Sequence, residues 1–311
     1  MKEENTRLRI LICIGGGPEA YAGIKFAARL SQQSCADIAL LYVRPLDSGL
    51  KSGGMEVRVA RENLLDWGLE LPGMRHLRTA RDILLELGEI SKESADAWQH
   101  REISGDPAGE YVRKYYNPCG GTISLRLRIS SDVTSAVVDE AERLGADIVI
   151  VGGSEDPASG FKKLLTPKSL ALRIASHTSR SVIVARQLEP GHGHLVCVQD
   201  TDRSREMIPR AIRYAHACQC SVTILSVAES EEQRQEAAAA VAHAATAFRD
   251  AGIEPQGCVV RVGVPAEVIA ETGEEFSLIV MAESEKPWFA KAFSVAHEVA
   301  AKARNSVLIV K

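Results

Sequence analysis

LRILICIG (residues 8–15) and LVCVQD (residues 195–200) open two halves of the chain that repeat one another. The first run leads, through a helix-like stretch, to a second apolar run, IALLYV (38–43), and the second run leads in the same way to VTILSV (222–227). An internal repeat is stronger evidence of architecture than any local motif. We therefore predict a duplicated strand–helix–strand module.

The echo continues toward the end of each half. ADIVIVG (146–152) parallels FSLIVMA (276–282), and SVIVA (181–185) parallels SVLIV (306–310). These runs are nearly continuous in Ile, Val and Leu, which is typical of parallel strands covered by helices on both faces. The sequence therefore predicts two doubly wound α/β sheets in tandem. The crossover helices are expected at 20–30, 136–145, 208–218, 231–251 and 265–274.

Length and composition favour an ordinary globular protein. A chain of 311 residues is long enough for two domains. Its formal net charge of -4 points to no polyanionic or membrane partner. The polar start, the lack of a long apolar run and seven scattered cysteines predict a cytoplasmic protein with reduced, mostly buried thiols.

We predict a first domain over residues 1–188 and a second over 192–311, joined by the linker QLEPGHGH (187–194). The first domain contains an insertion at about 48–122, with short helices expected at 64–68 and 76–88 and polar sequence after them. An insertion of this length is either functional or a passive surface elaboration.

With these repeated runs, the chain resembles two domains of the universal stress protein family in tandem. The resemblance covers nearly everything except the insertion. It implies a five-stranded parallel sheet of order 3-2-1-4-5 in each domain. It also implies that the domains pair through their last strands, Val182–Ala185 beside Val307–Val310, as an intramolecular pseudo-dimer.

Many members of this family bind ATP, with an acidic residue after the first strand and a glycine loop that meets the phosphates at a helix N-terminus. The resemblance implies candidate nucleotide-binding residues in the first half. They are Gly15, Gly16, Gly17, Val43, Gly152, Gly153, Ser154, Gly160, Lys168 and Ser169. This half departs from the family pattern, because glycines replace the acidic residue and Asp156 and Lys168 stand where glycines belong. A glycine turn without a ligand is the alternative.

The second half shows the opposite pattern. Asp200 matches the family's acidic residue, but Ala282, Glu285 and Phe293 replace the loop glycines and only Ser294 is kept. We therefore predict a degenerate second site, in which Asp200 is a helix N-cap or a relic of an ancestral site.

No H-E-x-x-H, G-x-S-x-G, P-loop or C-x-x-C motif is present, so we predict no catalytic residue and no enzyme of those classes. The resemblance leaves weak ATP hydrolysis open, without a general base to name. His192, His194, His216, Cys218 and Cys220 are metal-ligand types. We predict no metal site from them, because residues i and i+2 of a helix face apart. Arg126 and Arg128 form a short basic alternation, but nucleic-acid binding has little support.

The predicted function is that of a stress-associated regulatory protein whose first domain senses ATP or AMP, with or without Mg²⁺. The alternative is a ligand-free scaffold that binds a protein partner through the pseudo-dimer and the insertion. Further pairing between chains stays open. Neither alternative involves a membrane or a nucleic acid.

Overall fold

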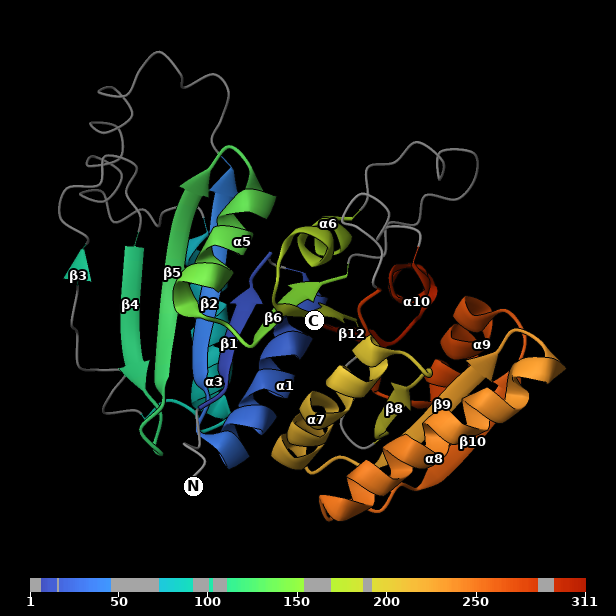
Figure 1. Ribbon diagram of the computed structural model, residues 1–311. Coiled ribbons are helices and arrows are strands. Elements are labelled where there is room, and N and C mark those ends of the chain that lie inside the picture. The colour runs from blue at the N-terminus through green and yellow to red at the C-terminus, as the bar shows by residue number, and fades with distance from the viewer. Residues whose placement is uncertain are drawn as a thin grey trace. The chain divides into compact units, whose positions relative to one another are not determined.

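A computed structural model of the chain describes residues 7–15, 17–45, 73–91, 101–102, 111–153, 169–186, 192–284 and 294–311 (Figure 1). Its contacts divide the chain into two compact units, 1–149 and 150–311. The division falls inside strand β6 (Ile148–Gly152). The domain bounds 1–188 and 192–311 stay a prediction.

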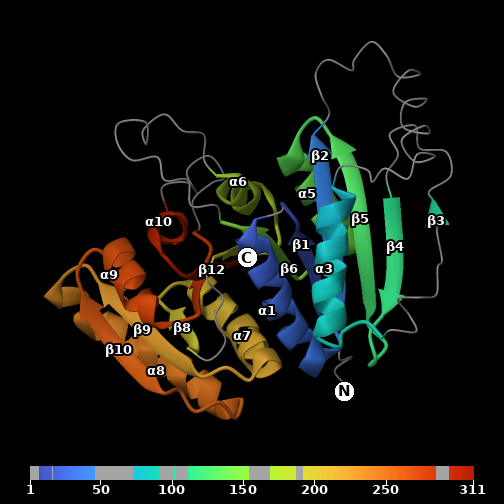
Figure 2. The ribbon, with the colours of Figure 1, turned by 180° about the vertical axis from the view of Figure 1, so that it is seen from behind.

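The first unit is a sheet with helices on both faces. Its strand order is β1-β2-β5-β4-β3, in which β1, β2 and β5 are parallel and β4 and β3 are antiparallel additions. Helices α1 and α3 contact each other on one face, and α5 covers the other (Figures 1 and 2). The elements are β1 (Arg9–Cys13), α1 (Pro18–Ser34), β2 (Asp37–Pro45), α3 (Met74–Glu86), β3 (Arg101–Glu102), β4 (Tyr111–Tyr116), β5 (Thr122–Ser130) and α5 (Val133–Leu144).

The described part of the insertion is more regular than the sequence suggests. Helix α3 confirms the helix expected at 76–88, whereas the helix expected at 64–68 lies outside the described residues. Strand β4 was not predicted, because its sequence YVRKYY lies in a long stretch that is polar as a whole. It is a strand by alternation: Arg113 and Tyr115 are buried while Lys114 and Tyr116 are exposed. The Arg113 guanidinium stacks over the Tyr115 ring at 5.0 Å, which shields the buried charge.

The second unit contains the predicted sheet in full. Its order β10-β9-β8-β11-β12 is the predicted 3-2-1-4-5, and every neighbouring pair is parallel. Helices α7 and α8 cover one face and α9 and α10 the other (Figures 1 and 2). The elements are α6 (Leu170–His177), β7 (Ser181–Ala185), β8 (His194–Cys197), α7 (Asp202–Cys218), β9 (Val222–Ala228), α8 (Arg234–Asp250), β10 (Gly257–Val262), α9 (Pro265–Thr272), β11 (Leu278–Ala282), α10 (Val295–Lys302) and β12 (Ser306–Val310), with 3₁₀ turns at Glu231–Gln233 and Gly273–Glu275.

The last strands of the two sequence halves pair as predicted. Strand β7 runs antiparallel to β12, with Val184 opposite Val307, Ile183 opposite Leu308 and Val182 opposite Ile309. All six of these residues are buried. Because β7 joins the edge of the second sheet, it belongs to the second compact unit although it comes from the first sequence half.

A buried carboxylate organises the contact between β5 and α5. Glu140 is fully buried and forms ion pairs with Arg126, Arg128 and Arg143. Arg126 and Arg128 are two residues apart on β5, so both side chains point to the face that α5 covers. The basic alternation seen in the sequence is therefore an internal ion cluster.

Among the described residues no helix combines the length and apolarity needed to cross a bilayer.

Candidate functional site

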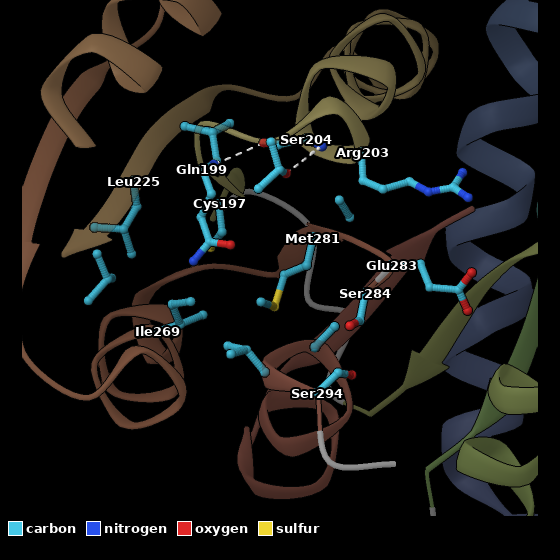
Figure 3. A pocket seen from close by; sticks show the side chains of 16 residues that line it. Cys197, Gln199, Arg203, Ser204, Leu225, Ile269, Met281, Glu283, Ser284 and Ser294 are labelled. Atoms are coloured by element: carbon cyan, nitrogen blue, oxygen red, sulfur yellow. Dashed lines mark hydrogen bonds between the residues drawn. The ribbon is translucent and has the colours of Figure 1, made fainter. Parts of the chain in front are cut away.

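The second unit has a cavity of about 270 Å³ at the carboxyl ends of β8, β9 and β11 (Figure 3). Its floor is apolar: Leu225, Ile269 and Met281 are all buried, and Met281 lies at the centre of the lining side chains. Polar side chains such as Gln199 and Ser284 lie around this floor. The cavity lies where the strand order reverses between β8 and β11, which is where open α/β sheets bind ligands.

The turn between β8 and α7 forms one wall of the cavity. Thr201 is the N-cap of α7, and its hydroxyl accepts a hydrogen bond from the Ser204 backbone N–H at 3.2 Å. The Ser204 hydroxyl in turn accepts from the Gln199 backbone N–H at 2.9 Å. Ser204 is 3% exposed, so this bond fixes the turn from inside. The wall is therefore formed before any ligand arrives.

The opposite wall begins at Ser294, the N-cap of α10. Its hydroxyl lies 3.0 Å from His297 Nδ1, and His297 Nε2 lies 3.2 Å from the Ser176 hydroxyl of α6. All three residues are buried. Hydroxyl groups thus hold both ring nitrogens of His297 and fix the start of α10. Helices α7 and α10 both begin at the cavity, and each N-terminus contributes a partial positive charge.

The charged side chains among the described lining residues are paired. Glu283, which lines it, forms an ion pair with Lys311, and both side chains are at most 10% exposed. Arg203 lines the rim, is half-exposed and pairs with Glu206 at 3.3 Å. Burial raises the pKa of the lining thiol Cys197, which keeps it neutral. No described residue of the cavity lining activates that thiol as a nucleophile.

Asp200 does not line this cavity. Its carboxylate pairs with the guanidinium of Arg205, and the N-cap of α7 is Thr201. The expectation that Asp200 caps the helix was therefore wrong by one residue. Thr201 has the extended backbone of an N-cap, and its hydroxyl reaches the first-turn N–H that needs an acceptor.

The predicted residues of the first half fall on both compact units. Gly15 and Gly17 lie just before α1, and Val43 lies on β2, all in the first unit. A Cβ atom at Gly15 would have nothing within 4 Å, so the backbone there is open to an approaching group. Gly16 lies outside the described residues.

Gly152, Gly153 and Ser169 belong to the second unit. A Cβ at Gly153 would lie 2.8 Å from Val184 Cγ1, so this glycine is required for packing against β7. Ser169 is the N-cap of α6 and accepts from the Leu172 backbone N–H at 3.4 Å. Ser154, Gly160 and Lys168 lie outside the described residues. The first-half nucleotide site stays a prediction.

Two disulfides correct the expectation of reduced thiols. Cys35 is bonded to Cys119 in the first unit, and Cys218 to Cys220 in the second. The argument that Cys218 and Cys220 face apart was wrong, because α7 ends at Cys218 and Gln219 takes a left-handed conformation (φ 53°, ψ 40°). That residue turns the chain back, so the helical rule for i and i+2 does not apply to the pair.

Residues 194–311 match the model of the universal stress protein family. They form a universal stress protein domain. A search of curated proteins gave no match. The family recognition from the sequence is thus confirmed on the second half. Over the rest of the chain the comparisons show the fold alone.

Two solved structures are similar in fold to nearly the whole chain. A putative universal stress protein from Pseudomonas aeruginosa UCBPP-PA14 is 14% identical, with a TM-score of 0.62, covering 99% of this chain and 94% of its own. A universal stress protein from Archaeoglobus fulgidus DSM 4304 is 14% identical, with a TM-score of 0.60, covering 97% and 96%. A universal stress protein from Archaeoglobus fulgidus in complex with dAMP covers 38% of this chain and 97% of its own, at 22% identity. Its TM-score is 0.33, so the dAMP remains a property of that protein.

Sequence reasoning missed the cavity. The second half has no glycine loop, and the cavity is built instead on Met281, Ile269 and Leu225, which the sequence only indicates as parts of two strands and a helix. The available signal was positional: Gln199, Val227 and Glu283 all stand at or just after the carboxyl end of a predicted strand.

Proposed function

We propose that this universal stress protein is a regulatory binding protein whose second unit holds the nucleoside part of an adenine nucleotide, with AMP a better fit than ATP. The observation that carries the proposal is the cavity at the carboxyl ends of β8, β9 and β11. It lies at the switch point of the sheet, between walls that internal hydrogen bonds hold in place.

The size and lining of the cavity suit one heterocycle and its sugar. A volume of about 270 Å³ lies just below the usual range of small-molecule sites, about 300 to 1,000 Å³, which favours a compact ligand over a dinucleotide. Met281 and Ile269 offer a flat base the apolar contact that it needs. The Gln199 and Ser284 side chains, which lie on the rim, supply the polar groups that a ribose or a base edge requires.

The charge around the cavity favours one phosphate over three. The helix N-termini of α7 and α10 attract an anion, and Arg203 is the cationic side chain among the described residues of the lining. Glu283 would repel a phosphate, but Lys311 pairs with it and neutralises its charge. A triphosphate with Mg²⁺ would need the glycine loop that this half lacks, so the magnesium part of the prediction attaches only to the first-half site.

The first-half site and the ligand-free scaffold are the competing proposals. Gly15 and Gly17 lie at the start of a 17-residue helix, where free N–H groups favour an anion, and this supports a first-half nucleotide site. The scaffold would leave both sites empty. The variants below distinguish the second-unit site, the first-half site and the ligand-free scaffold.

Isothermal titration calorimetry with adenosine, AMP and Mg-ATP tests the proposal. Val295 lines the cavity at the first position of α10 and is half-buried, so Val295→Trp fills the cavity from its edge. Gly15→Glu places a carboxylate in the open space of the first-half turn. We expect one site per chain that binds AMP, is lost in Val295→Trp and is kept in Gly15→Glu.

Arg203 and Arg205 provide a matched pair of charge variants. Both lie in the first turn of α7, are about half-exposed and pair with an acid three residues away, but only Arg203 lines the cavity. Arg203→Ala should weaken AMP binding by about tenfold, since a charge-assisted contact contributes about 1.5–3 kcal/mol and this one is partly solvated. Arg205→Ala should leave it unchanged. Loss in Gly15→Glu instead would support the first-half site, and no heat from any ligand would support the scaffold.

A further inference from the structure

We propose that His194, Cys218 and Cys220 form a Zn²⁺ site when the two cysteines are reduced, with the fourth coordination position open to solvent. The three donor atoms, one per residue, all lie within 4.8 Å of one another. The cluster is at the amino end of β8, whereas the cavity is at its carboxyl end. It is therefore a separate site, and it does not depend on the proposed function.

Backbone hydrogen bonds hold the two segments that carry the three ligands next to each other. Helix α7 ends at Cys218, and the left-handed Gln219 lets the Cys220 backbone N–H donate to Ala215 O at 3.1 Å. On the other side, the His194 backbone N–H donates to Ser221 O at 2.8 Å, next to Cys220. The loop that ends α7 and the strand that brings His194 are thus fastened directly to each other.

The separation of the imidazole and the first sulfur already fits a metal. His194 Nε2 lies 3.6 Å from Cys218 Sγ. In a tetrahedral zinc site, Zn–N and Zn–S bonds of ordinary length put a nitrogen and a sulfur about 3.6 Å apart and two sulfurs about 3.8 Å apart. The two sulfurs, which are bonded to each other in the structure, need to separate.

Burial gives the site both a dry interior and an entrance. His194 and Cys218 are 1% and 6% exposed, while Cys220 is half-buried. Two buried soft ligands and one partly accessible ligand suit an ion that enters from the Cys220 side. A set of one imidazole and two thiolates, with a water in the fourth position, is a known coordination set for zinc.

The disulfide makes the site dependent on reduction. A thiol reductant transfers two electrons and two protons to the Cys218–Cys220 bond and is itself oxidised to a disulfide, which leaves two free thiols. Zn²⁺ then displaces the two thiol protons and binds the two sulfurs as thiolates. The bond closes a loop with one intervening residue, so it constrains the unfolded chain much less than a long-range disulfide does. Its loss is therefore a small cost to the fold.

Zinc content after dialysis tests the proposal. Wild-type protein reduced with a phosphine is incubated with ZnCl₂, freed of excess metal, and released zinc is measured with a chromophoric chelator. We expect one zinc per reduced chain and none per oxidised chain. Co²⁺ in place of Zn²⁺ should give the visible absorption of a tetrahedral thiolate site in the reduced protein alone.

Variants identify the ligands. Cys220→Ser changes a half-buried residue, so the fold should survive, and it should abolish zinc retention. Cys258→Ser is the matched control, because Cys258 is a free and exposed cysteine outside the cluster, and it should retain one zinc. His194→Gln, checked for folding by circular dichroism, should weaken binding by more than about tenfold. Reduced wild-type protein without zinc, or Cys220→Ser that retains it, would overturn the proposal.

Discussion

Replacing Glu140 by Gln should destabilise the first unit strongly while changing its shape little. The Glu140 carboxylate is fully buried and accepts from Arg128 Nη1 at 2.8 Å, pairs with Arg126 Nη1 at 3.1 Å and contacts Arg143. The side chain of Arg126 is 9% exposed, so after the substitution its guanidinium stays buried without a counter-charge. The amide NH₂ of Gln would also face guanidinium donors, which is unfavourable.

The magnitude follows from the burial of each partner. Removing one member of a buried ion pair costs about 3–5 kcal/mol because the other charge is left uncompensated. Arg143 is half-exposed and its share is at most about 1 kcal/mol. We therefore expect Glu140→Gln to lower the free energy of unfolding by about 3–4 kcal/mol. For a unit of this size that corresponds to a fall in Tm of about 6–16 °C.

Differential scanning calorimetry measures this effect, and a double variant tests its cause. Arg126→Met combined with Glu140→Gln removes both buried charges and should recover much of the loss, since neutral replacement of a whole buried pair is often close to neutral. Arg143→Gln should cost less than about 1 kcal/mol. If Glu140→Gln costs no more than Arg143→Gln, or if the double variant is the sum of its single variants, the reasoning is refuted.

Three further outcomes are expected. Burial acts to raise the pKa of Glu140, but hydrogen bonds from Arg143 and Arg128 outweigh it and hold that pKa below its ordinary value. The contribution of the Glu140 carboxylate to the free energy of unfolding is therefore present above the unfolded pKa of about 4.3 and is lost as pH falls through the folded pKa. The Tm difference between wild type and Glu140→Gln should shrink below about pH 4, and a constant difference down to pH 2 would contradict this. Cys119→Ser should lower the unfolding free energy of the first unit, measured in urea without reductant, by about 4 kcal/mol, because the disulfide to Cys35 spans 84 residues; equal midpoints would show that the bond does not form. Asn305→Ala should cost about 1–3 kcal/mol in the second unit, because the Asn305 amide donates to the carbonyls of Gly273, Glu274 and Phe276; a loss below about 0.5 kcal/mol would mean that water replaces it.

The fold could be predicted because its strands and helices correspond to long apolar runs that are repeated in the two halves of the sequence. The helix expected at 231–251 is observed as a 3₁₀ turn from Glu231 and α8 to Asp250, and the strand pairing of Ile183 with Leu308 follows from the matching SVIVA and SVLIV segments. Each prediction used period and composition over several residues. Such signals survive in a single sequence because burial requires them at every turn or pleat.

The details that failed depend on single backbone conformations. Gln219 has a positive φ although it is not a glycine, so nothing in the sequence marks the turn that brings Cys220 back beside Cys218. The shift of the N-cap from Asp200 to Thr201 is also a one-residue matter, and both residue types are good caps. Strand β4 was not predicted for a third reason. Arg113 is buried and stacks on Tyr115, whereas an arginine in a sequence normally indicates a surface position.

The cavity of the second unit was not predicted because the sequence was searched for a phosphate loop. The second half lacks the loop glycines, and sequence reasoning therefore treated it as degenerate. The cavity arises instead from the packing of Leu225, Ile269 and Met281 where three strands end, which needs the sheet order and the helix positions together. No linear motif contains that information.

The most direct test of the account is the NMR signal of the Met281 methyl group. The chain has five methionines, so selective ¹³C-methyl labelling gives a simple spectrum, and Met281→Leu assigns the signal. Addition of AMP should shift the Met281 methyl strongly, because a purine ring on the cavity floor brings its ring current to that group, while Met74 on α3 of the first unit should not move. A saturating shift at Met281 that is absent in Val295→Trp is the predicted result. An unmoved Met281 at AMP concentrations that release heat would show that the nucleotide binds elsewhere, and the proposal of a second-unit site would be wrong.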